Sequence, residues 1–190
     1  QNTINIFFIS VFVVIAYFNS FDNEFSYDDN YLILNNPQIE SIENYIYTPK
    51  WFKLFDNRSL SKLTYSLNFY IHGYEVFGYH LLNVLIHLAA SITAYFLSLQ
   101  FIRKIPKKRL NISLEAAFAL ISALIFALHP IQTDAVSYVT QRMASMAGLF
   151  VLLSIFFYIK FRESLRINKK QQALIYICFC IVSFILSILS

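Results

Sequence analysis

The sequence predicts an all-α fold, a polytopic membrane helical bundle of about five transmembrane helices. Its composition is the first reason: 57% of the 190 residues are hydrophobic and 14% are charged, which is too apolar for an ordinary soluble domain. The second is that the apolar residues form long runs instead of alternating with charged ones. The third is that basic residues flank these runs, as the positive-inside rule describes. The net charge of +4 therefore does not indicate a nucleic-acid partner.

Five apolar segments are the expected spans, and we place them at residues 1–18, 79–101, 114–128, 143–159 and 173–190. The first is interpreted as a retained helix and not a signal peptide, because bulky residues follow it where a small-residue cleavage site would be needed. We expect a single membrane domain over residues 1–190 that is part of a longer protein.

Two basic loops orient the bundle. Residues 103–109 and 160–170 hold ten of the fifteen lysines and arginines. They follow the second and fourth spans, so they lie on one side, which the positive-inside rule makes cytoplasmic. The outer loop, residues 19–78, and the His129–Arg142 turn then share the periplasmic or lumenal side.

The outer loop is expected to contain amphipathic helices on the membrane surface. Leu60, Leu63, Leu67 and Ile71 follow one another at spacings of three, four and four residues, which places them along one face of a helix. A second short helix is expected after Pro37.

Two adjacent carboxylates, Asp28 and Asp29, come shortly after the first span. Neighbouring residues cannot face the same way on a helix or strand. One of them could enter a pocket, with a raised pKa, and act as a general base, while the other caps a helix or pairs with a cation. The alternative is a solvated polar turn.

A polar stripe runs through the second span, where His80, Asn83, His87 and Ser91 are spaced three, four and four residues apart. Ionisable residues inside a span usually face protein or a water-filled cavity. The stripe could line a channel for a substrate or lipid headgroup. It could equally provide hydrogen bonds between helices.

A third polar cluster lies in the His129–Arg142 turn. His129, Asp134 and Arg142 are expected at the outer face, at the level of the aspartate pair. The planar fork of an arginine suits phosphate. An ordinary capped turn between two spans is the alternative.

Several ordered motifs carry a family resemblance. They are the aromatic-flanked "DD" with "YLILNNP", then "NRSL", "LNFYIHGYEVFGYHLLNVLIH" and "ALHPIQTDAVSYVTQR". Together they resemble the N-terminal half of the transmembrane and tetratricopeptide-repeat protein O-mannosyltransferases and their bacterial relatives, which belong to the GT-C glycosyltransferases. The similarity covers roughly residues 25–158.

The resemblance implies a GT-C-like inverting enzyme that moves a mannose-like sugar from a polyprenyl-phosphate carrier to a hydroxyl of a protein or glycan acceptor on the outer or lumenal face. It implies that Asp28 or Asp29 is the catalytic base. The residues that it implies for substrate binding are Arg58, His80, His87, His129, Asp134 and Arg142. No cofactor is certain, although the aspartate pair could hold Mg²⁺ or Mn²⁺.

Some positions depart from the family pattern. Ser59 stands where the family has proline, Gln132 where it has histidine, and Asp134 where it has glutamate. These changes leave room for an alternative function, a non-catalytic GT-C-derived membrane subunit that scaffolds or anchors a larger complex. The expected partners are therefore the lipid bilayer, the lipid-linked sugar, the acceptor and other membrane subunits, without nucleic acid.

Overall fold

The computed structural model describes residues 1–41, 58–104 and 111–190, and these parts form helices and turns without a β-strand. The predicted all-α membrane bundle is therefore confirmed. The main helices are α1 (Asn2–Tyr17), α3 (Ser59–His72), α4 (Val76–Ile102), α5 (Ile112–Leu128), α6 (Gln132–Ser137), α7 (Arg142–Arg166) and α8 (Lys170–Leu189). Short helical turns cover Phe18–Asp22 (η1), Asn30–Leu34 (η2) and Val139–Gln141 (η4).

Four helical stretches in the described residues are long and apolar enough to cross a membrane: Asn2–Asp22, Val76–Ile102, Val139–Arg166 and Lys170–Leu189. They correspond to the first, second, fourth and fifth expected spans. The third expected span is α5, which has 17 residues. At 1.5 Å per residue α5 is about 26 Å long, slightly less than the hydrocarbon core of a bilayer.

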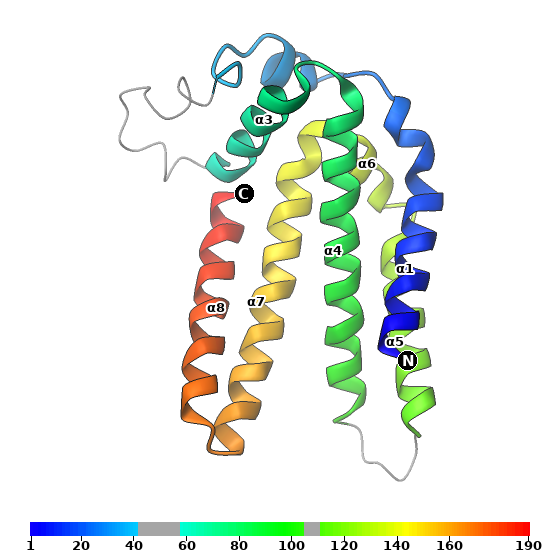
Figure 1. Ribbon diagram of the computed structural model, residues 1–190, viewed down its shortest axis with the longest axis vertical. Coiled ribbons are helices and arrows are strands. Elements are labelled where there is room, and N and C mark those ends of the chain that lie inside the picture. The colour runs from blue at the N-terminus through cyan, green and yellow to red at the C-terminus, as the bar shows by residue number, and fades with distance from the viewer. Residues whose placement is uncertain (42–57, 105–110) are drawn as a thin grey trace.

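Helix α4 occupies the middle of the bundle, with α1 and α5 on one side and α7 followed by α8 on the other (Figure 1). The core between α1, α4 and α5 includes Ile9, Val13, Val84 and Tyr95. Helix α5 contributes small side chains to it, and these are Ala119, Ala123 and Ala127. Small residues allow membrane helices to approach closely, which compensates for the absence of a hydrophobic driving force within lipid.

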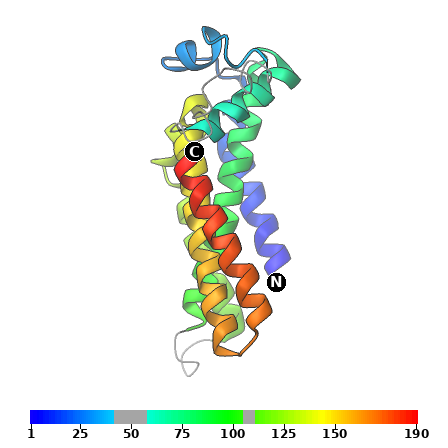
Figure 2. The same ribbon diagram turned by 90° about the vertical axis from the view of Figure 1, so that its left-hand side faces the viewer.

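The two ends of the bundle differ in what they carry. The end of α4, the start of α5 and the turn between α7 and α8 lie at one end, while α3 and the residues after α1 cover the other (Figures 1 and 2). The flanks of both basic loops therefore share one end, as the predicted topology requires. That this end is cytoplasmic stays a prediction.

The surface helix expected around Leu60–Ile71 is confirmed as α3, Ser59–His72. Its inward face is largely polar: Ser61, Ser66 and Asn68 are buried beside Tyr65, whereas Leu67 and Ile71 are exposed. An apolar face directed outward suits a helix at a lipid surface. The second helix expected after Pro37 falls mainly on residues 42–57, outside the described residues.

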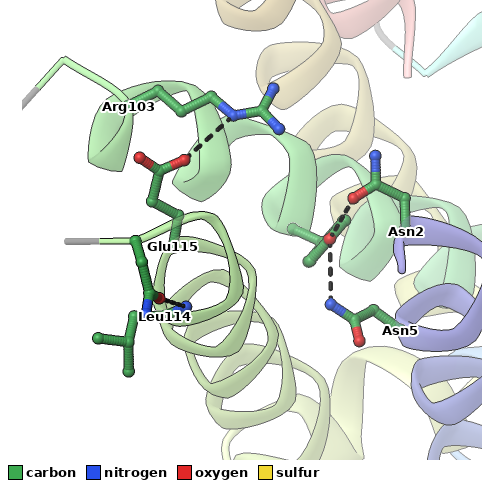
Figure 3. Close-up of polar contacts among 7 residues, drawn as sticks. Asn2, Asn5, Arg103, Leu114 and Glu115 are labelled. Atoms are coloured by element: carbon green, nitrogen blue, oxygen red, sulfur yellow. Dashed lines mark hydrogen bonds and ion pairs between the residues drawn. The ribbon is translucent and has the colours of Figure 1, made fainter. Parts of the chain in front are cut away.

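Polar contacts join α1, α4 and α5 near the end that carries the basic loops (Figure 3). The buried Asn5 amide donates to the Tyr95 hydroxyl at 3.1 Å and to the Ala116 carbonyl at 3.3 Å, and Tyr95 donates to Asn2 at 2.9 Å. Arg103 and Glu115 form an ion pair nearby at 3.6 Å. Three helices that are distant in sequence are thus held in register.

Candidate functional site

An open cleft of about 600 Å³ lies between the segment after η1 and the α6–η4 region. Its lining is polar and aromatic, and consists of Asn23, Glu24, Ser26, Tyr27, Thr133, Asp134, Ser137, Tyr138 and Gln141. One wall therefore comes from the first outer loop and the other from the turn between α5 and α7. The sequence placed these two segments on the same side of the membrane, and the structure brings them into contact.

Asp29 joins the two walls of the cleft. Its side chain is 1% exposed, and its two carboxylate oxygens accept the backbone N–H groups of Ser26 and Thr140, each at 3.0 Å. Burial raises the pKa of Asp29, and the two N–H groups partly oppose this effect. Asp29 therefore holds its own segment, residues 23–29 (the acidic loop), against the opposite wall.

Asp28 is exposed and directly follows the lining residue Tyr27, without lining the cleft itself. Its backbone N–H donates to the hydroxyl of Tyr138, a lining residue, at 2.7 Å. The preceding residue, Tyr27, has a φ of +48°, an uncommon conformation for a residue with a side chain, and its ring meets Tyr138 edge-on at 6.3 Å. The two aspartates thus differ as their adjacency predicts: one is buried and bonded, and the other is accessible.

Arg142 lies behind the α6–η4 wall and is fully buried. Its guanidinium donates to Asn83 and Asn68, both at 2.7 Å, to the Tyr79 carbonyl at 2.9 Å and to Thr64 at 3.2 Å. The structure therefore directs Arg142 to protein groups on α3 and α4 and leaves it no open face for the phosphate contact expected from the resemblance.

Comparison with known proteins finds relatives that are named protein O-mannosyl-transferases. The human protein O-mannosyl-transferase TMTC4 is 31% identical over 169 residues, which are 80% of this chain and 22% of that protein. The Xenopus laevis protein O-mannosyl-transferase tmtc2 is 34% identical over 157 residues, 77% of this chain and 18% of that protein. The Caenorhabditis elegans protein O-mannosyl-transferase F38B6.6 is 25% identical over 86% of this chain.

The chain is a relative of the TMTC protein O-mannosyl-transferases. It spans about a fifth of the length of the curated relatives that it matches. No protein-family model matches the chain, and no solved structure matches it.

The two histidines of the α4 stripe have different surroundings in this TMTC relative. His80 is buried and its Nε2 donates to the carbonyl of Asn23, a residue that lines the cleft, at 2.9 Å. His87 lies deeper, where its Nε2 donates to the Ala127 carbonyl at 2.9 Å and its ring stacks on Phe126. The geometry connects His80 to the cleft and gives His87 the interhelical role that the sequence left open as an alternative.

The remaining expected binding residues are accessible. Asp134 lines the cleft. His129 is exposed at the end of α5, and its Nδ1 accepts the Ile131 N–H at 3.2 Å, which leaves Nε2 to act as a donor. Arg58 is exposed just before α3, with a φ of +74°. Neither His129 nor Arg58 lines the cleft.

Sequence reasoning missed several lining residues. Glu24 and Gln141 face the cleft, and Tyr138 and Thr140 hold the acidic loop. Glu24 lies four residues before Asp28 in an acidic stretch, which was the one available signal. Tyr138 and Thr140 are marked by no spacing or composition, because their partners are more than a hundred residues away in the sequence.

Metal-ligating residues are not grouped in the described parts of the chain. No set of three or more His, Cys, Asp or Glu side chains there lies close enough to hold a metal ion. That the aspartate pair could hold Mg²⁺ or Mn²⁺ stays a prediction, and each oxygen of Asp29 already accepts one backbone N–H group.

Proposed function

We propose that the chain is part of a membrane glycosyltransferase that transfers a mannose-like sugar from a polyprenyl-phosphate carrier to a hydroxyl of a protein or glycan acceptor on the outer or lumenal face. The observation that carries this proposal is the acidic loop fixed across a polar cleft by Asp29. The names of the relatives, protein O-mannosyl-transferases, support the reaction class.

The two aspartates have separate roles in this proposal. A general base must come within hydrogen-bond reach of the acceptor proton. Asp28 is exposed, whereas each oxygen of Asp29 accepts a backbone N–H group. Asp28 is therefore the proposed base, and Asp29 is a positioning residue that keeps Asp28 over the cleft.

The reaction then follows a single displacement. Asp28 takes the proton of the acceptor hydroxyl, and the acceptor oxygen forms a bond to the anomeric carbon of the sugar. The bond between that carbon and the carrier phosphate breaks, and the phosphate leaves with the electron pair. Inversion at the anomeric carbon is the expected outcome.

The phosphate of the carrier needs donors outside the cleft lining, since no Lys or Arg is among the described lining residues. Arg58 and the Nε2–H of His129 are the accessible groups that we propose for this contact. His80, which touches Asn23, and Asp134 are proposed to contribute on the cleft side. A divalent cation would need the phosphate oxygens as ligands, and no step is assigned to one.

A non-catalytic subunit that scaffolds a larger membrane complex is the second candidate. The acidic, cation-free lining of the described cleft favours it, as does Gln132 in place of the family's histidine. In this case the cleft and its aromatic rim would be a contact surface for another membrane subunit.

Transfer in membranes containing the full protein separates the two candidates. The substrates are a polyprenyl-phosphate-linked mannose and hydroxyl-bearing acceptor peptides, and the variants are Asp28→Asn and the control Asp22→Asn. Asp22 is also an exposed carboxylate outside the cleft lining, but it lies in η1, whereas the backbone N–H of Asp28 is held by the hydroxyl of the lining residue Tyr138. We expect Asp28→Asn to insert normally and lose transfer, while Asp22→Asn keeps it. Full transfer by Asp28→Asn would reject the proposed base, and a wild-type protein without any transfer would favour the subunit.

A further inference from the structure

Arg142 is a buried cation whose described polar partners are all neutral. It is the first residue of α7 and is 0% exposed. Its guanidinium lies 4.9 Å from the centre of the Tyr65 ring and 5.8 Å from that of Tyr79. Burying a charge is costly, so every available donor has to be satisfied. Four hydrogen bonds engage all three guanidinium nitrogens, and they also fix the orientation of the side chains that accept them.

Asn83 connects Arg142 with the wall of the cleft, because its amide contacts both. Its Oδ1 accepts the Nε–H of Arg142 at 2.7 Å. Its Nδ2 group lies 3.2 Å from the carbonyl of Val136, 3.1 Å from that of Tyr138 and 3.5 Å from that of Val139. Because a guanidinium can only donate, the amide oxygen of Asn83 must face Arg142, and the amide NH₂ must then face the three carbonyls.

Those carbonyls belong to the wall that holds the acidic loop. The Tyr138 hydroxyl accepts the Asp28 N–H, and the Thr140 N–H donates to Asp29. The Tyr65 hydroxyl donates to the Thr140 carbonyl at 3.0 Å, and the Tyr65 ring lies against the guanidinium. Arg142 is therefore connected to the backbone of residues 136–140 through Asn83 and through Tyr65.

We propose that Arg142 is a positioning residue that acts through Asn83: it fixes the amide orientation of Asn83, which sets the Val136–Val139 wall and thereby the place of the Asp28–Asp29 loop. The catalytic consequence rests on the proposed transferase function. The structural consequence, a well-ordered Thr140 N–H, does not depend on it.

Two asparagines on the same guanidinium provide a matched experiment. Asn68 also accepts from Arg142 at 2.7 Å, but its own amide donates to the Gly78 carbonyl at 3.1 Å, in the first turn of α4. Asn83→Asp and Asn68→Asp both keep the oxygen that Arg142 needs and delete the amide donors. Only Asn83→Asp removes hydrogen bonds to the wall of the cleft.

Hydrogen exchange in detergent is measured on peptides covering residues 137–141, with thermal unfolding as a check of folding. We expect Asn83→Asp to speed exchange in this segment by about tenfold, because local opening becomes easier, and Asn68→Asp to leave it unchanged. Where transfer is measurable, Asn83→Asp should lower kcat by about tenfold with little change in the acceptor KM, the result expected when the base is misplaced and binding is retained.

Equal exchange in the two variants, or unchanged exchange in Asn83→Asp, would overturn the proposal. If Asn83→Asp does not fold, Arg142→Lys gives the second test, because an ammonium keeps the charge but cannot reproduce the planar fork. It should speed exchange in residues 137–141 with α8 unaffected, and a uniform change over the whole chain would overturn the proposal. Selective exchange in a protein without transfer would support the positioning role and reject the proposed function.

Discussion

Replacing Asp29 by asparagine should weaken the fold, although Asn has nearly the same shape. The Asp29 carboxylate accepts two backbone N–H groups, from Ser26 and Thr140, both at 3.0 Å. Asparagine offers one oxygen and one NH₂ group, so it can accept one of these N–H groups and must present a donor to the other. The change therefore breaks one of the two links between the walls of the cleft.

The size of the loss is a balance of two terms. A hydrogen bond to a charged group contributes about 1.5–3 kcal/mol, and an unpaired buried donor adds to its loss. Against this, the neutral amide avoids the desolvation cost that raises the pKa of Asp29. We expect a net loss in the free energy of unfolding of about 1–2 kcal/mol, or a fall in Tm of roughly 2–8 °C.

The pKa of Asp29 also predicts how this difference changes with pH. Its pKa is raised in the folded state, so the folded protein binds the proton more tightly than the unfolded chain. Its contribution to stability is complete below the unfolded pKa, about 3.9, and declines as the pH rises through the folded pKa. Asparagine has no such proton, so wild type and variant should differ more near pH 4 than near pH 7.

Thermal unfolding in detergent, followed by helical circular dichroism at both pH values, measures these effects. Asp28→Asn is the matched control, since Asp28 is exposed and engages Tyr138 through its backbone, and its stability should change by no more than about 0.5 kcal/mol. Equal Tm values for the two variants, or a larger loss in Asp28→Asn, would refute the reasoning.

Two further predictions concern packing and interhelical contacts. At Gly78, a Cβ atom would lie 2.5 Å from the ring of His72, so Gly78→Ala should lower the free energy of unfolding by about 1–3 kcal/mol. Adding His72→Ala should recover part of this loss. No recovery would show that the strain arises elsewhere. Asn5→Ala removes the donor to Tyr95 and Ala116 and should lower the free energy of unfolding by about 1–2 kcal/mol in the same assay. Asn2→Ala, at an exposed position, should lower it by less. A larger loss for Asn2→Ala would contradict the role given to Asn5.

Hydrophobic patterning was sufficient to predict the helices, because apolar length and periodicity are local properties of the sequence. The order of the spans, α3 and the shared end of the basic loops follow from it. The partners of the polar face of α3 did not, since periodicity identifies this face without saying which side chains of the bundle it contacts. Leu67 and Ile71 turn outward, and the serines turn inward.

The candidate site was predicted in part. Adjacency required Asp28 and Asp29 to differ, but only the contact between Asp29 and Thr140, 111 residues apart, decides which one is buried. Arg142 was expected to face a ligand because arginine suits phosphate. Its acceptors Asn68 and Asn83 come from two other helices, and no local pattern in the sequence connects them with it.

The inward polar face of α3 has a consequence for biosynthesis. Besides the buried Tyr65 ring, α3 docks through polar contacts, and one of them is the hydrogen bond from Arg142 to Asn68. Arg142 is 74 residues further along the chain and leaves the ribosome later than α3. This contact between α3 and α7 can therefore form only after α7 has been synthesised, later than the helix that it holds.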